Sequence, residues 1–116
     1  MSLDPRVAAA QAALAAWGEF VEDGDVERLK PWFAEDGPQY RQLAEEAGAL
    51  TATEGGPGYL VLLREASVLH EGPDEAVVGG KVTWARSPET KQEYAWEVVL
   101  RNVGEDRWLL WTVRDG

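Results

Sequence analysis

Apolar residues recur every three or four positions along the first part of the chain, which is the period of an α-helix with one buried face. They are Val7, Ala10, Leu14, Trp17 and Val21. Before them, Asp4 is placed to cap free amides, and Pro5 occupies a position where a missing N–H costs nothing. Gly24 suits the left-handed conformation that follows many helices. The pattern therefore predicts a helix that begins at Pro5 and ends before Gly24.

Two shorter helices are predicted after this first one. Asp25 can cap the second, which Pro31 interrupts because proline cannot donate a hydrogen bond to the preceding turn. Pro38 begins the third helix, and Gly48 is the predicted stop. The apolar residues that share a face of the third helix are Tyr40, Leu43, Ala44 and Ala47.

From Tyr59 onward the period changes to two, which is typical of strands. Four such segments follow, separated by turns: Tyr59–Leu69, Ala76–Trp84, Tyr94–Leu100 and Arg107–Val113. Strands joined by short turns cannot run parallel, because a parallel pair needs a crossover of a dozen or more residues. We therefore predict an α+β fold in a single domain, residues 1–116, with helices at about 4–48 packed on a four-stranded antiparallel meander at about 59–114.

The last strand carries large apolar side chains at successive positions. Trp108 and Leu110 fall on one face, and Leu109, Trp111 and Val113 fall on the other. A strand of this kind is covered on both faces, and the helices can cover only one of them. We expect a second subunit to cover the other, with Trp108 and Trp111 as the candidate residues of a homodimer interface.

Charge and composition disfavour several classes of function. The 21 acidic residues outnumber the 11 basic ones, for a formal net charge of −10, and such a surface repels nucleic-acid backbones and anionic membranes. The absence of cysteine removes disulfides, thiolate zinc sites and cysteine nucleophiles, and it fits a reducing compartment. No stretch reaches the roughly 20 apolar residues that a membrane helix needs, and the N-terminus lacks a signal-peptide pattern. We expect a cytoplasmic protein that binds neither nucleic acid nor membrane.

Several stretches resemble a known superfamily. They are the alanine-rich first helix, Gly24-Asp25-Val26-Glu27-Arg28-Leu29, Trp32-Phe33-Ala34-Glu35-Asp36, and the closing Asp106-Arg107-Trp108-Leu109-Leu110. Together they are similar to the nuclear transport factor 2-like (NTF2-like) superfamily, which includes the ketosteroid isomerase and SnoaL-like polyketide cyclase groups. The resemblance implies a curved sheet wrapped against helices into a cone with an apolar pocket, and dimers through the outer face of the sheet. The short connection at 51–58 indicates a shortened version of that fold.

No catalytic or metal-binding constellation stands out in the sequence. An isomerase-type site needs a carboxylate base and oxyanion donors in an apolar pocket, but Glu93 and Glu97 alternate with apolar residues and are expected to face solvent. His70 is the one histidine, and it is expected in an exposed loop. With no cysteine and no calcium-loop spacing, we expect neither a metal nor a cofactor.

Six tryptophans in 116 residues are the unusual feature of the composition, because aromatic side chains serve cores, pockets and interfaces alike. The candidate lining of a small apolar pocket is Trp17, Tyr40, Tyr59, Trp84 and Trp96. The sequence favours a non-catalytic binding or interaction module for a small hydrophobic ligand. Two alternatives stay open. One is an isomerase- or cyclase-type enzyme acting on a small hydrophobic carbonyl compound, and the other is an acidic inhibitor or immunity-type partner of a basic protein.

Overall fold

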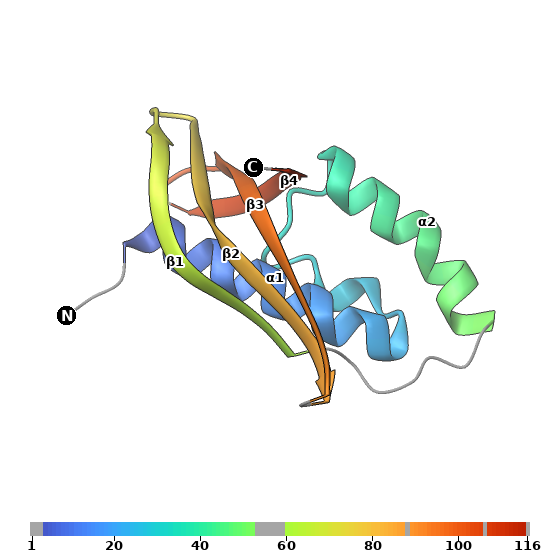
Figure 1. Cartoon of the computed structure of the whole chain (residues 1–116). Helices are drawn as coiled ribbons and strands as arrows, with labels where there is room; N and C mark the ends of the chain where they lie inside the picture. The colour runs from blue at the N-terminus through green and yellow to red at the C-terminus, as the bar shows by residue number, and fades with distance from the viewer. Residues whose placement is uncertain (1–3, 53–59, 88, 106, 116) are drawn as a thin grey trace.

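The computed structural model describes residues 4–52, 60–87, 89–105 and 107–115. Two α-helices precede four strands, and a short 3₁₀ helix lies between the helices. The elements are α1 (Pro5–Asp23), η1 (Val26–Arg28), α2 (Pro38–Ala52), β1 (Leu60–Glu71), β2 (Glu75–Ser87), β3 (Thr90–Asn102) and β4 (Trp108–Asp115). The strands form one antiparallel sheet in the order β1-β2-β3-β4, with α1 lying across one face and α2 beside β4 (Figure 1). The predicted α+β architecture and the meander are confirmed.

Helix α1 begins and ends as the sequence predicts. The carboxylate of Asp4 accepts a hydrogen bond from the backbone N–H of Arg6 at 2.9 Å, and Pro5 occupies the first turn. At the other end, Gly24 is left-handed, with φ of 69°, and its N–H donates to the carbonyl of Phe20 at 2.7 Å. This conformation costs glycine little because it has no Cβ.

The predictions for the next two helices are wrong in detail. The second helix is a single 3₁₀ turn, Val26–Arg28. The third does not stop at Gly48 but continues to Ala52. A glycine inside a helix costs only about 1 kcal/mol relative to alanine, which is too little to end a helix when the residues that follow have good helix propensity.

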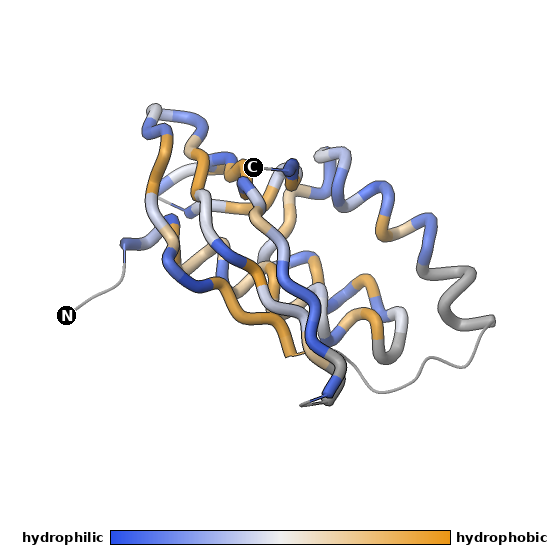
Figure 2. The backbone as a smooth tube through the Cα atoms, viewed as in Figure 1, coloured by the Kyte–Doolittle hydropathy of each residue, from blue (hydrophilic) through white to orange (hydrophobic). Residues whose placement is uncertain are grey.

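The hydrophobic core lies between α1 and the face of the sheet that we call the inner face; the opposite face is the outer face. The largest fully buried side chains include Leu14 and Phe20 from α1, Leu43 from α2, and Val98 and Leu100 from β3. Figure 2 shows apolar segments of the sheet and of α1 in orange. Within the described part of the chain, no helix has the length and apolarity needed to cross a membrane.

A bulge in β4 changes which residues face the core. Leu100 pairs with Leu110, but the preceding Val99 pairs with Thr112, so Trp111 is an extra residue in β4. Val113 therefore pairs with Val98 and packs against the core. The simple alternation that placed Val113 on the same face as Trp111 is wrong for that reason.

Candidate functional site

Three tryptophans meet in the interior between α1 and the inner face. Trp17 of α1 packs edge-on against Trp84 of β2, with ring centroids 5.4 Å apart, and stacks on Trp96 of β3 at 5.7 Å. Trp96 also stacks on Tyr94, at 5.2 Å, and Phe33 packs edge-on against Trp17 at 6.4 Å. Such contacts add about 0.5–1.5 kcal/mol each beyond simple burial. The rings occupy the space in which the sequence predicts an apolar pocket.

A small hollow opens at the edge of this aromatic cluster, between α1, α2 and the end of β4. We call it the α2 hollow. Its volume is about 280 Å³, and it is lined by Trp17, Gln39, Gln42, Trp96, Val113, Arg114 and Asp115. This volume lies just below the roughly 300–1,000 Å³ of pockets for drug-sized ligands, so the α2 hollow fits a molecule of one or two rings.

Both polar and charged groups line the rim of the α2 hollow. Gln39 is buried, with 7% of its surface exposed, whereas Gln42 is exposed and its amide donates to Glu46 at 3.4 Å. The guanidinium of Arg114 donates a hydrogen bond to the carboxylate of Glu97 at 2.8 Å, so the positive charge of Arg114 is balanced by Glu97. Asp115 adds a carboxylate at the end of β4. The hollow thus combines two indole rings with amide groups.

The predicted pocket residues are only partly brought together. Trp17 and Trp96 line the α2 hollow, while Trp84, 8% exposed, lies in the core behind them. Tyr40 packs against the core from α2 and is not among the lining residues. Tyr59 lies outside the described residues. Sequence reasoning missed the contribution of α2 and β4: Gln39 and Gln42 are one helical turn apart, and Val113 was placed on the wrong face.

The acidic residues that could serve a catalytic site lie elsewhere. Glu65, Glu93 and Glu97 lie on the outer face, where they pair with Lys81, Arg64 and Arg114 at 3.0, 3.2 and 2.8 Å. In the described part of the chain, the buried polar side chains are Gln39 and Thr83. His70 is exposed as expected, although it lies in β1 and not in a loop. Among the described residues, no group of three or more His, Cys, Asp or Glu is placed to hold a metal ion.

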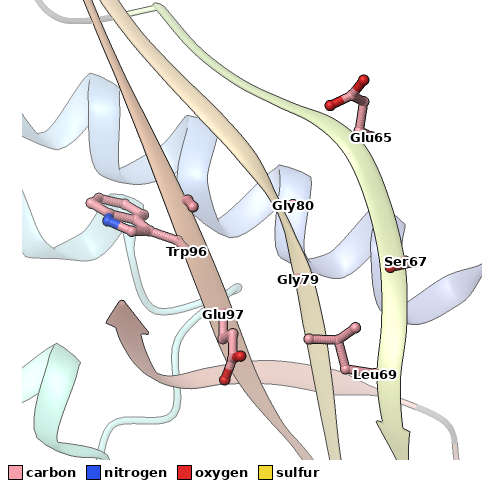
Figure 3. Close-up of a pocket in the computed structure, with 8 residues that line it drawn as sticks. Glu65, Ser67, Leu69, Gly79, Gly80, Trp96 and Glu97 are labelled. Atoms are coloured by element: carbon pink, nitrogen blue, oxygen red, sulfur yellow. The ribbon is translucent and has the colours of Figure 1, made fainter. Parts of the chain in front are cut away.

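A second hollow lies on the outer face, and we call it the outer-face hollow. Its volume is about 280 Å³, and it is lined by Glu65, Ser67, Leu69, Gly79, Gly80, Ala95, Trp96 and Glu97. Figure 3 shows Leu69 reaching from β1 toward β2 beside Gly79, with Glu97 projecting from β3. The hollow forms because Gly79 and Ala95 carry little or no side chain at the centre of this face.

Comparison with solved structures identifies the fold. An NTF2-like superfamily protein from Salmonella enterica superposes with a TM-score of 0.57 at 15% identity, over 92% of this chain and 87% of that one. The chain has an NTF2-like fold. A protein of this fold from Streptomyces avermitilis, described as a putative dehydratase, matches with a TM-score of 0.50 at 22% identity, over 95% of both chains. The sequence itself matches no family model and no curated protein.

A third structural neighbour comes from Xanthomonas campestris. It is described as a putative calcium/calmodulin-dependent protein kinase II association domain, with a TM-score of 0.53 and 16% identity over 93% of this chain and 82% of that one. Identities this low establish the shared fold and nothing finer. In the NTF2-like fold of this chain, the interior is filled with aromatic rings, and both hollows are open to solvent.

The two tryptophans proposed for a dimer interface lie on different sides of the NTF2-like sheet. Trp108 is 8% exposed and belongs to the core. Trp111, in the β4 bulge, is half-buried, and the guanidinium of Arg101 lies 3.7 Å above its ring. Arg101 pairs with Leu109 and belongs to the outer face, so Trp111 is the one of the two that can meet a partner there.

Proposed function

We propose that this NTF2-like chain is a non-catalytic binding module that holds a small flat ligand in the α2 hollow. The observation that carries the proposal is the placement of Trp17 and Trp96. Both are only partly buried, and both line the α2 hollow next to the amides of Gln39 and Gln42. Apolar walls with a few convergent polar groups are the usual composition of a small-molecule site.

The packing of the rings suggests which ligands suit the site. Trp96 stacks on both Trp17 and Tyr94, with interplanar angles of 23° and 21°, so these ring faces are already engaged within the protein. A ligand that contacts the edges of the indole rings meets partial positive charge there. The side-chain amides of Gln39 and Gln42 can both donate and accept hydrogen bonds. A small aromatic ring that bears a carbonyl or an amide satisfies both demands.

A catalytic role is less well supported. Acid–base chemistry next to a carbonyl needs a positioned group whose pKa is tuned by its surroundings, and a desolvated carboxylate is the usual choice. Glu65, Glu93 and Glu97 lie on the outer face of the sheet in ion pairs, and Glu71 of β1 pairs with Arg6. An activity such as that in the name of the Streptomyces protein would need a base at the α2 hollow. The carboxylate there, Asp115, is exposed.

The test is a titration with a panel of small aromatic carbonyl compounds and amides, starting with nicotinamide and indole-3-carboxamide. Binding is expected to change tryptophan fluorescence and to raise the melting temperature. Gln42→Ala removes one rim amide and should weaken binding roughly 2- to 10-fold, the worth of one hydrogen bond. Trp32→Phe is the control, because Trp32 is exposed outside the α2 hollow and its loss should leave the affinity unchanged. If no compound in the panel raises the melting temperature, the α2 hollow is not a ligand site.

We also propose that the chain forms a homodimer through the outer face. Leu62 and Leu69 of β1 are 43% and 57% exposed, and Leu69 lines the outer-face hollow. The three cross-strand ion pairs on this face balance their own charges. A second copy can therefore approach this face without the repulsion that a net charge of −10 produces elsewhere.

A further inference from the structure

At each edge of the sheet, part of the edge strand is paired with groups from the helical half of the chain. An edge strand exposes unpaired N–H and C=O groups, which invite pairing with another chain. At β4, the backbone of residues 32–34 closes the edge: the N–H of Leu110 donates to the carbonyl of Trp32 at 2.8 Å, and the N–H of Ala34 donates to the carbonyl of Leu110 at 2.9 Å. Phe33 and Leu110 thereby form a parallel bridge.

A single side chain does the same at β1. The amide Nε2 of Gln11 donates to the carbonyl of Val61 at 3.1 Å, and its Oε1 accepts from the N–H of Leu63 at 2.8 Å. In a parallel ladder, one residue of a neighbouring strand bonds in this way to the two residues that flank its partner. The Gln11 amide thus takes the place of one residue of a fifth strand, opposite Leu62.

The surroundings of this contact show why the edge needs closing. Leu60-Val61-Leu62-Leu63 is uncharged and wholly apolar, and Leu60 and Leu62 are 62% and 43% exposed. An uncharged apolar segment at the open edge of a long strand favours self-association. Gln11 is also the one residue with an amide or charged side chain from Val7 to Trp17, where the helix is otherwise built from alanine and larger apolar residues.

We propose that Gln11 is an edge plug: its amide occupies the free hydrogen-bonding positions of β1 and prevents a second copy from adding its own β1 strand there. Removal of the amide turns Leu60–Leu63 into an edge that accepts a strand. This proposal concerns the edge of the sheet and does not depend on ligand binding at the α2 hollow or on association through the outer face.

The test compares Gln11→Met, which keeps the length of the side chain and removes both hydrogen bonds, with the wild type in sedimentation experiments over a range of concentrations. Gln11→Met is expected to form species larger than the wild type at concentrations over which the molecular mass of the wild type stays constant. Hydrogen exchange at the Leu63 amide should speed up roughly tenfold or more in dilute Gln11→Met. The Leu63 amide should then become protected again as the larger species form.

Loss of stability alone must not explain the result. Leu43→Val is the control, because Leu43 is buried in α2 and, among the described residues, α2 makes no contact with β1. Conditions can be chosen at which both variants have the same free energy of unfolding. Equal association of Leu43→Val and Gln11→Met would overturn the proposal, and so would a Gln11→Met protein with the wild-type mass at all concentrations. Should Gln11→Met fail to fold, hydrogen exchange in the wild type still tests the proposal. A Leu63 amide that exchanges without protection in the wild type would show that Gln11 does not occupy the edge.

Discussion

Two neighbouring glycines in β2 face opposite sides of the sheet and meet different surroundings. A Cβ at Gly80 would lie 2.9 Å from the carbonyl oxygen of Arg64 and 3.2 Å from Cα of Ala66, both backbone atoms of β1. A Cβ at Gly79 would meet only the side chain of Leu69, at 2.6 Å from Cδ1. Backbone cannot move aside without breaking the ladder, whereas Leu69 is 57% exposed and can adopt another rotamer.

The two alanine substitutions are therefore expected to differ in stability. Gly80→Ala should lower the free energy of unfolding by about 1–3 kcal/mol, the usual cost of forcing extra volume into a packed site. Gly79→Ala should change it by less than about 0.5 kcal/mol. Urea denaturation of both variants measures the difference, with unchanged m-values as the sign that only the native state was affected. Equal effects of the two substitutions would mean that β1 can move away from β2 near the bulge between Arg64 and Ser67.

The bulges also mark the limit of what the sequence reveals about individual elements. Period-two patterning correctly predicted the four strands and their order, because each strand has one face in the core. It could not predict the extra residue at Trp111, since a bulge depends on pairing between strands that are distant in the sequence. Val113 was misplaced as a result, and with it one wall of the α2 hollow. Gln11 was visible only as an interruption in an apolar helix, because its partners in β1 are 50 residues away.

The α1 helix offers a prediction about pH. Hydrogen bonds from the side chain of Arg6, and next from its backbone N–H, hold the pKa of Asp4 below its usual value. A carboxylate with a lowered folded-state pKa stabilises the protein above its ordinary pKa of about 4, and this contribution is lost as the pH falls through the lowered value. Asp4→Asn keeps a capping side chain without the charge. It should therefore be less stable than the wild type at pH 7, and the two should converge in acid.

Thermal unfolding from pH 7 down to about pH 2 checks this expectation, because the contribution of the carboxylate should shrink as the pH falls below the ordinary pKa of about 4. The control is the same substitution in an Arg6→Gln background, where the charged donor is missing. In that background, Asp4→Asn should change the melting temperature of the Arg6→Gln protein by a smaller amount, and this change should vary less with pH. A wild type that keeps its full advantage over Asp4→Asn in strong acid would show that the effect comes from capping geometry and not from charge.

Across the whole molecule, charge is distributed unevenly between the helices and the outer face. Residues 4–52 contain ten acidic and four basic residues, whereas each outer-face glutamate considered above has a basic partner across the strands. Two copies that meet through their helices therefore repel each other, and part of each sheet edge is already paired, at Val61 and Leu63 of β1 and at Leu110 of β4. Of the surfaces available to a second copy, the outer face is therefore the one at which we expect the least electrostatic repulsion.

Ala95 is the position at which to test this association. It is exposed at the centre of the outer face and lines the outer-face hollow, so Ala95→Arg would place a bulky, unpaired cation where a second copy has to pack. Burying an unpaired charge costs several kcal/mol, enough to convert a dimer with a micromolar dissociation constant into a monomer. Ala12→Arg adds the same side chain to α1, outside this face, and should leave the mass unchanged. In light scattering at tens of micromolar, we expect dimers for the wild type and Ala12→Arg and monomers for Ala95→Arg. A monomeric wild type would contradict the dimer itself, while a dimeric Ala95→Arg would move the interface to another surface.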